Sequence, residues 1–460
     1  MMNAHLQTRQ NSIDELPGMK ALAERLGRKP IVGLVSISPI ADDPRVRRQG
    51  DAFYDLGWDV KAFGLQSKVE SAPAWSIETP EDARQLPTPP TMPETPYRTR
   101  GIRRLAIASL ALAERRAVRA NRHDDAYDLR LLRVFFDKAL AETIYWTLNS
   151  TFWDIYALAR RQNADLWLGN DWTSLPIISR IAGEQGVPYV YDTHEFAAEE
   201  FNERKLWRYV QRPIRLETEQ RFIRGAAVVT TVSTGIAERL QAIHGLPEKP
   251  QTVRSTPLYQ KMPPRTTGER VRVLYHGAVW HHRGLEECIR SVALWRPEYD
   301  LTIRGPASED YRRSLEAEID KAGVRGRVEI VPPVPMTKLV QEASAFDVGL
   351  FALPGHSLHN EYALPNKFFE YTMAGLALCV SDLPEMAALV RHHRHGITFH
   401  GVSPDVIATA INGLTRAKID EMKQNALKAA QDLSWEEERM RMLRAYDALF
   451  GKEADKRLLA

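Results

Sequence analysis

Residues 360–385 read NEYALPNKFFEYTMAGLALCVSDLPE and place a lysine and an acid where both could contact one ligand. Lys367 and Glu370 are three residues apart, so on a helix they share a face. Pro365 marks the start of that helix, where the free N–H groups around Asn366 could hold an anion such as a diphosphate. An acid beside a phosphate fits best as an acceptor of hydroxyl hydrogen bonds, for example from a ribose diol. The alternative is a solvated Lys367–Glu370 pair on an exposed helix face.

A second group of polar residues follows predicted strands in the first half of the chain. The run GVPYVYDTHEF places Asp192, His194 and Glu195 at a strand end, and Asp43 and Arg45 follow an earlier strand. Ligands of open parallel sheets bind beyond the carboxyl ends of the strands, so these side chains are expected to face a cleft. Two structural alternatives stay open, because a lone histidine near a sheet edge is usually structural and Asp43 also suits a helix cap.

The run YHGAVWHHRGLEE, residues 275–287, forms a turn between a predicted strand and a predicted helix. Gly277 permits a close approach of the backbone, and Arg283 comes just before the helix. A cation there suits the charge that develops on a departing diphosphate. The histidines of this turn have no standard metal-ligand spacing, so no metal site is expected.

The elements that position these residues form two series of alternating strands and helices, which predict two parallel sheets. No GxGxxG motif is present, which counts against a redox cofactor. Single long helices are expected over 129–161 and 199–224, and a helix over 366–374 ends at Gly375. The predicted organisation is a lead with a short helix, a first α/β domain, a second α/β domain and a C-terminal helix, at residues 1–28, 29–262, 263–432 and 433–460.

Composition narrows the class of protein. The chain has 460 residues, of which 44% are hydrophobic and 26% charged, as in ordinary soluble proteins. The N-terminus lacks the pattern of a signal peptide, and no apolar run is long enough for a spanning helix. Cys288 and Cys379 are expected to be reduced core residues of a cytoplasmic protein. A net charge of +3 gives no reason to expect a nucleic-acid partner.

A strongly basic helix is predicted after residues 71–97, whose many prolines indicate an irregular surface loop. Its arginines flank the apolar run LAIASLALA, and Glu114 is the single acid among them. The helix could dock on anionic lipid headgroups, or it could be a core helix with solvated ends. The arginines in question are Arg98, Arg100, Arg103, Arg104, Arg115, Arg116, Arg119 and Arg122.

Read in order, three motifs resemble the retaining GT-B glycosyltransferases of the large family 4, or group 1, type. These are D-x-H-E at 192–195, PNKFFEY at 365–371 and DLPE at 382–385. The resemblance runs from about residue 30 to about residue 450. It implies a GT-B fold, in which two Rossmann-like parallel-sheet domains face a cleft and a C-terminal helix crosses back to the first domain.

The resemblance also implies roles for residues of the second domain. Glu370 matches the second of two family glutamates, the one that binds the ribose of a nucleotide sugar. The first family glutamate falls on Tyr362, with Glu361 one place earlier, so Glu361 is the candidate for the donor sugar. A family arginine falls on Ala278, which leaves Arg283 at the position of its partner lysine.

Further roles follow from the same resemblance. Lys367, Arg283 and the helix start at Asn366 would stabilise the leaving diphosphate. Backbone at Gly277, at Gly305 and in the loop of Pro333 would contact the nucleotide. In the first domain, His194 would lie near the transferred sugar, and the other cleft residues would be Asp43, Arg45, Asp192 and Glu195.

The implied activity is transfer of a sugar, with retention, from a nucleoside diphosphate sugar to a saccharide or lipid-linked acceptor in polysaccharide or glycolipid biosynthesis. The first domain would bind the acceptor and the second the donor, without a cofactor or a bound metal. One alternative is a nucleotide-sugar 2-epimerase of the same fold. Another is a non-catalytic nucleotide-sugar-binding subunit, suggested by Tyr362 and Ala278. A cytoplasmic protein is expected, peripheral on the inner face of the membrane if the arginine helix binds lipid.

Overall fold

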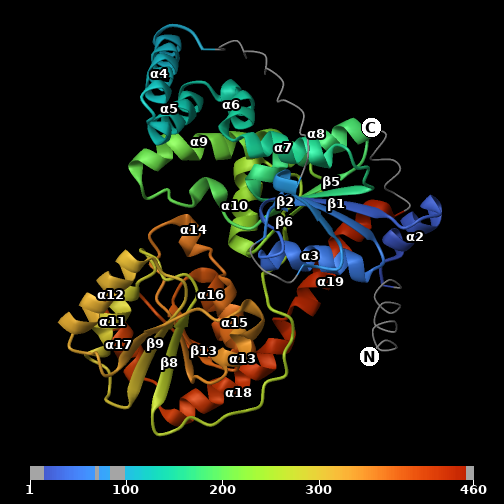
Figure 1. Cartoon of the computed structure of the whole chain (residues 1–460). Helices are drawn as coiled ribbons and strands as arrows, with labels where there is room; N and C mark the ends of the chain where they lie inside the picture. Colours follow the sequence, from blue (N-terminus) through green and yellow to red (C-terminus); the bar gives the residue numbers. More distant parts are fainter. Residues whose placement is uncertain (1–14, 68–71, 83–98, 452–460) are drawn as a thin grey trace. The chain divides into compact units, whose positions relative to one another are not determined.

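The computed structural model describes residues 15–67, 72–82 and 99–451 (Figure 1). The chain divides into two compact units, each with its own sheet. The first contains residues 1–232, 236–253 and 441–460, and the second contains residues 233–235 and 254–440. The division falls after Val253, whereas the sequence placed it after residue 262. The predicted C-terminal helix, α19 (Trp435–Asp447), belongs to the second unit up to Met440 and to the first from Arg441 on.

The first unit is built on a seven-stranded parallel sheet of order β3-β2-β1-β4-β5-β6-β7. Every residue of β4 and β5 is buried, which explains why these strands read as continuous apolar runs in the sequence. The strands are β1 (Ile31–Pro39), β2 (Asp59–Leu65), β3 (Ser76–Glu78), β4 (Leu166–Asn170), β5 (Tyr189–Thr193), β6 (Val228–Thr231) and β7 (Gln251–Thr252).

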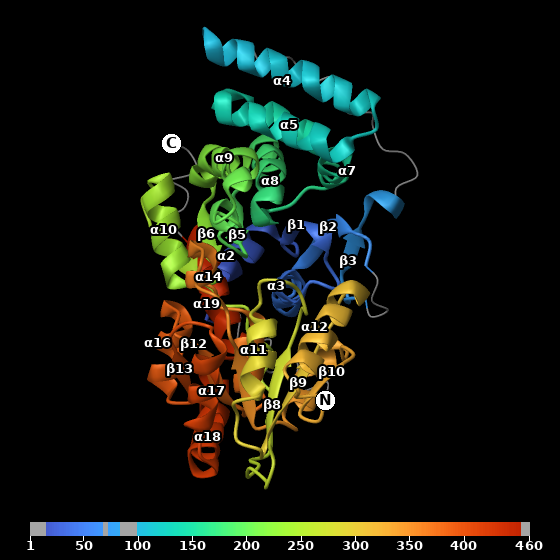
Figure 2. The same ribbon diagram turned by 90° about the vertical axis from the view of Figure 1, so that its left-hand side faces the viewer.

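The helices of the first unit are α2 (Pro17–Leu26), α3 (Pro44–Asp55), α4 (Ile102–Arg119), α5 (His123–Phe136), α6 (Ala141–Leu148), α7 (Ser150–Ala159), α8 (Asp171–Gln185), α9 (Lys205–Phe222) and α10 (Thr234–His244). Short 3-10 turns complete the unit: η1 (Pro80–Asp82), η2 (Lys138–Leu140), η3 (Ala197–Glu199), η4 (Ile223–Gly225) and η6 (Ala448–Phe450). In Figures 1 and 2, α4 lies along α5, and α5 lies over α9.

Three sequence expectations for this unit are wrong in detail. The single helix expected over 129–161 is broken twice, because Asp137 caps η2 and Asn149 caps α7 through their side chains. Both residue types compete for backbone N–H groups and so favour helix starts over helix interiors. The proline-rich segment 71–97 is not wholly irregular, since β3 pairs in parallel with β2; residues 71 and 83–97 lie outside the described part. The helix expected from residue 199 begins at Lys205, with η3 before it.

The second unit is built on a six-stranded parallel sheet of order β10-β9-β8-β11-β12-β13. The strands are β8 (Val271–His276), β9 (Tyr299–Arg304), β10 (Val328–Val331), β11 (Val348–Phe351), β12 (Ala377–Ser381) and β13 (Gly396–Phe399). The helices are α11 (Leu285–Val292), α12 (Glu309–Lys321), η5 (Met336–Lys338), α13 (Leu339–Ala343), α14 (Leu358–Glu361), α15 (Asn366–Met373), α16 (Pro384–His393), α17 (Pro404–Asn412) and α18 (Arg416–Asp432).

Both sheets reverse their strand order at one place, between β1 and β4 in the first unit and between β8 and β11 in the second. The order on either side of this switch point is that of Rossmann folds. Ligands of such sheets bind beyond the carboxyl ends of the strands at the switch point. Ligand sites are therefore expected at the carboxyl ends of β1 and β4 in the first unit, and of β8 and β11 in the second.

Candidate functional site

The backbone at the end of β8 leaves no room for side chains. Gly277 adopts φ +112°, a conformation that favours glycine. A Cβ on Gly305, at the end of β9, would lie 1.8 Å from the carbonyl oxygen of Gly277, and a Cβ on Gly277 would lie 3.1 Å from Cε of Lys367. Both glycines of the sequence prediction therefore stand where the backbone must pack closely at the switch point. Their contact with a nucleotide stays a prediction.

Lys367 extends from the first turn of α15 to the end of β8. Its Nζ lies 3.8 Å from the centre of the Tyr275 ring and 4.5 Å from that of Phe351. Burial lowers the pKa of Lys367 well below its usual value, and the nearby charge of Arg283 lowers it further. Among the described residues no carboxylate lies within ion-pair distance of its Nζ. An anion bound beside Lys367 and Arg283 would favour the protonated form of Lys367, and it would meet two basic side chains that no described carboxylate pairs with.

Glu370 does not pair with Lys367, so the solvated pair considered as an alternative is not formed. Its Oε2 lies 2.8 Å from Nε2 of His276, the last residue of β8. The Glu370 side chain keeps 15% of its surface exposed, whereas His276 is buried. Glu370 and the two basic side chains thus act on one another at one edge of the sheet, but no ion pair joins them within the described residues.

The remaining residues predicted to bind the donor are half-buried or exposed. Arg283 is half-buried and precedes Gly284, where a Cβ would lie 2.2 Å from the carbonyl oxygen of Ala352 after β11. Asn366 is exposed in the first turn of α15, and Glu361 is the half-buried last residue of α14. Pro333 is exposed in the loop between β10 and η5.

In the first unit, Asp192 at the end of β5 is buried and fully engaged. Arg45 donates two hydrogen bonds of 2.7 Å to its two oxygens, and Gln49 and Thr230 donate bonds of 2.6 and 2.5 Å. Burial alone would raise the pKa of Asp192, but Arg45 and His194 hold it well below its usual range. Arg45 and Asp192 therefore form a buried ion pair at this sheet edge, and Asp192 also contacts His194.

His194 lies next to the Arg45–Asp192 ion pair. Its Nε2 is 2.7 Å from Oδ1 of Asn170 and 3.4 Å from Oδ2 of Asp192, and its Nδ1 is 3.5 Å from Oδ2 of Asp171. Burial lowers the pKa of His194, but the charges of Asp171, Asp192 and Asp43 outweigh burial and raise it to about 9. At neutral pH this ring is therefore an imidazolium whose two N–H groups both donate.

The other two residues predicted here have different surroundings. Asp43 caps α3 by accepting from the backbone N–H groups of Arg45 and Val46, at 3.1 and 3.3 Å, so the capping alternative is confirmed. Ser38 donates a further bond of 3.1 Å to the same carboxylate. Glu195 is exposed beyond the end of β5.

Four residues at these edges were not identified from the sequence. Asn170 and Asp171 end β4 and begin α8, and Asp171 adopts φ +63°, which is unfavourable for a residue with a side chain. His276 and Tyr371 complete the surroundings of Glu370. The polar ending of the run ADLWLGND was the available signal for the first pair. The contacts of His276 depend on the fold, and no spacing in the sequence predicts them.

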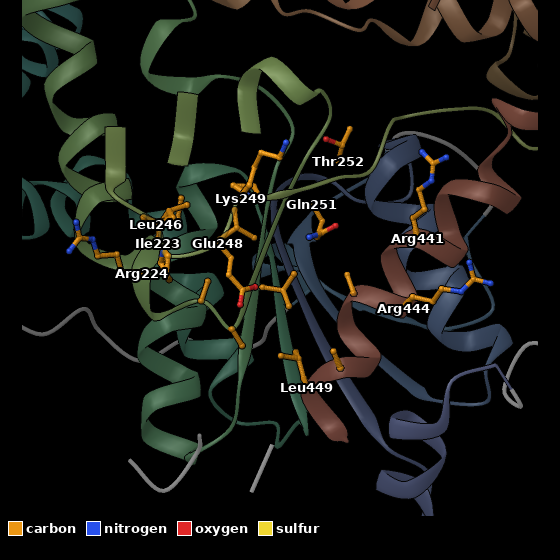
Figure 3. Close-up of a pocket in the computed structure, with 18 residues that line it drawn as sticks. Ile223, Arg224, Leu246, Glu248, Lys249, Gln251, Thr252, Arg441, Arg444 and Leu449 are labelled. Atoms are coloured by element: carbon orange, nitrogen blue, oxygen red, sulfur yellow. The ribbon is translucent and has the colours of Figure 1, made fainter. Parts of the chain in front are cut away.

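A separate pocket of about 640 Å³ lies in the first unit, beside the starts of β6 and β7 and the second half of α19. Figure 3 shows that its arginines, Arg224, Arg441 and Arg444, point away from one another. Such an arrangement does not converge on one anion. The pocket also lies at the opposite end of β6 from Thr231, away from the edge that holds His194. We assign no ligand to it.

Comparisons with known proteins agree with this geometry. Residues 43–257 match the family model of the glycosyl transferase 4-like domain, and residues 270–417 match that of the glycosyl transferases group 1. No curated protein sequence matches the chain.

Three solved structures of similar fold illustrate the likeness. Sucrose-phosphate synthase from Thermosynechococcus elongatus has a TM-score of 0.59 at 16% identity, covering 92% of this chain and 99% of the other. Anabaena HepE, solved with UDP and glucose, has a TM-score of 0.59 at 13% identity, covering 91% and 98%. WaaG, a glycosyltransferase involved in lipopolysaccharide biosynthesis, has a TM-score of 0.55 at 13% identity, covering 92% and 100%. The chain is therefore a glycosyltransferase of the group 1 family, with the GT-B fold of two Rossmann-like units.

Proposed function

We propose that this glycosyltransferase moves a sugar, with retention, from a nucleoside diphosphate sugar to a saccharide or lipid-linked acceptor in polysaccharide or glycolipid biosynthesis. The observation that carries the proposal is Lys367, half-buried beside Arg283 without a carboxylate partner among the described residues, over the closely packed backbone at the switch point. Anabaena HepE has been solved with UDP-glucose on the same fold, which supports a nucleotide sugar as the donor.

The residues of the second unit divide the donor between them. Lys367, Arg283 and the start of α15 face the diphosphate, and they stabilise it most as it departs and its charge grows. Glu370 accepts hydrogen bonds from the ribose hydroxyls, and Glu361 is the candidate for the donor sugar. In these assignments the basic side chains bind the negatively charged diphosphate, and the carboxylate accepts from hydroxyl donors. An acid and two basic side chains can therefore serve one ligand at the same sheet edge.

The first unit is proposed to bind the acceptor. His194, as an imidazolium, donates from Nδ1, whose contact with Asp171 is long at 3.5 Å, to a sugar hydroxyl, and Asp192 with Arg45 keeps the ring in place. In the described part of the chain, no three His, Cys, Asp or Glu side chains converge as metal ligands would. Transfer without a metal ion stays a prediction.

Product analysis with a panel of nucleotide sugars tests the proposal. With acceptor and EDTA present, we expect a new glycosidic product whose anomeric configuration, read by NMR at early times, equals that of the donor. A 2-epimer formed from donor alone would establish the epimerase instead. Nucleotide binding without turnover across the panel would establish a non-catalytic binding subunit.

We also propose that helix α4 docks on an anionic membrane surface. Its single acid, Glu114, is turned inward and pairs with Arg130 and Arg133 of α5 at 2.6 and 3.1 Å. The charged residues on the outer face are therefore all arginines. Apolar side chains lie between them, of which Ile102 is 85% exposed and Leu105 69%. The exposed arginines are Arg100, Arg103, Arg104, Arg115, Arg116, Arg119 and Arg122, the last paired with Asp125; Arg98 lies outside the described residues.

This composition suits lipid headgroups above a shallow apolar layer. None of the helices in the described residues combines the length and apolar character that crossing a membrane requires. The association that we propose is peripheral, through the exposed arginines and apolar side chains of α4.

Vesicle co-sedimentation tests the surface. Replacing Arg103, Arg104, Arg115 and Arg116 by Gln should weaken binding to anionic vesicles at least about tenfold, since each such charge contributes on the order of 1 kcal/mol. A control removes the same charge from exposed arginines elsewhere, Arg312, Arg313, Arg325 and Arg391, and should bind as the parent does. Equal loss in both variants, or no binding by the parent, would refute the proposal.

A further inference from the structure

The end of β8 and the start of α15 are matched residue by residue. Tyr275 and Gly277 contact Lys367, and His276 between them contacts the two consecutive residues Glu370 and Tyr371. The backbone N–H of His276 donates to Oη of Tyr371 at 2.9 Å, and the two rings lie 4.7 Å apart at an angle of 32°. His276 is therefore fixed at its backbone and along one face of its ring.

The imidazole of His276 is 1% exposed, and its Nε2 lies 2.8 Å from Oε2 of Glu370. The two groups are close, although they are not aligned as a straight hydrogen bond, and Nδ1 makes no hydrogen bond within the described residues. A buried polar ring with so few partners is costly. The charged group that lies against this ring is the Glu370 carboxylate.

Lys367 lies one helical turn before Glu370, and the charge of Glu370 acts on that lysine. If Glu370 turned to Lys367, the acid and the cation would neutralise each other, and neither would be available to a ligand. Oε2 of Glu370 instead lies 2.8 Å from Nε2 of His276, a residue of a different element, and no ion pair joins Glu370 to Lys367 within the described residues.

We propose that His276 is a positioning residue, which holds the Glu370 carboxylate toward the ribose of the donor and away from Lys367, and so enables the site to select ribonucleotides over 2′-deoxyribonucleotides. The inference rests on the proposed nucleotide-sugar site and specifies its selectivity. A carboxylate that accepts from both ribose hydroxyls loses one bond when the 2′-hydroxyl is absent. A carboxylate drawn to Lys367 has no such preference.

Calorimetric titration of the full chain with two matched pairs, UDP with 2′-deoxy-UDP and GDP with 2′-deoxy-GDP, tests this. For the pair whose base the parent accepts, we expect the ribose form to bind at least about tenfold tighter. His276→Phe, which keeps a ring against Tyr371, should reduce that preference to about twofold or less and leave the affinity for the deoxy form nearly unchanged. His276→Gln, whose amide can still reach the carboxylate, should recover part of the preference.

Two further results decide between this role and a merely structural one. If His276 only supports the fold, both forms lose affinity in parallel and the preference is unchanged, which would overturn the inference while the proposed function stands. If the parent binds none of the nucleotides, the proposed function fails first and the inference falls with it. His281→Phe, in the exposed part of the same turn, is the matched control and should keep the parental preference. Should His276→Phe not fold, the Gln variant alone must still show a reduced preference.

Discussion

At the scale of single residues, the two sheet edges differ in how their charges are paired. In the first unit, Asp192 is satisfied by several donors and supports the imidazolium of His194. In the second unit, burial lowers the pKa of Lys367, no carboxylate in the described residues pairs with it, and Glu370 contacts His276. The first arrangement presents a fixed hydrogen-bond donor, whereas the second presents charges for a ligand to complete.

The charge of Asp171 should be visible in the stability of the first unit. Because the pKa of His194 is raised from 6.5 to about 9, its stabilising contribution is fully present below about pH 6.5 and is lost as pH rises through about 9. Asp171→Asn tolerates the positive φ and removes only the charge, which lowers the pKa of His194 in the folded state. The stabilising contribution of His194 should therefore be smaller, and it should be lost at a lower pH than in the parent. Urea unfolding of parent and variant between about pH 6 and pH 9.5 measures the effect. Identical pH dependence in the two proteins would contradict it.

At the scale of elements, the alternation of strands and helices was predictable, because buried parallel strands read as apolar runs between polar turns. The helix of PNKFFEY forms as expected from Pro365 and ends before Gly375, which adopts φ +73°. The segment 129–161 was not predictable in the same way, because its apolar residues continue through the breaks. Only the caps at Asp137 and Asn149 divide it, and a cap residue within an apolar run is a weak signal.

Helix α18 is expected to depend on one buried ion pair. Nζ of Lys423 lies 2.9 Å from Oδ1 of Asp347, and the second oxygen of Asp347 accepts from the backbone N–H of Arg272 at 2.9 Å. Both side chains are almost fully buried. Lys423→Met leaves the buried carboxylate with only the longer contact to Nε of Arg272, at 4.0 Å, and should lower the free energy of unfolding by up to about 3–5 kcal/mol.

Chemical denaturation measures this, with Lys418→Met, an exposed position on the same helix, as a control that should change stability by less than about 0.5 kcal/mol. The double variant Lys423→Met, Asp347→Asn should lose less than the single one, because no charge is then left buried. A single variant as stable as the control would show that the pair does not support α18.

At the scale of the whole molecule, the sequence motifs were sufficient for the two-sheet GT-B architecture and for the elements that carry Lys367, Glu370 and His194. They were not sufficient for the pairings among those elements. Glu370 was expected to pair with Lys367 if it paired at all, since the two are neighbours on one helix. The structure joins it instead to His276, on a strand far away in sequence. Such contacts follow from strand order and register, which single motifs do not encode.

The second unit is proposed to bind a nucleoside diphosphate sugar with Glu370 on its ribose. Calorimetric titration of Glu370→Ala with a nucleotide sugar and with the free diphosphate tests it most directly. Each charged hydrogen bond lost is worth roughly 1.5–3 kcal/mol, so both affinities should fall at least about tenfold. Glu361→Ala should weaken only the nucleotide sugar, and Glu342→Ala, an exposed acid of α13, should change neither. Parental affinity of Glu370→Ala for both ligands would contradict the assignment of the donor site.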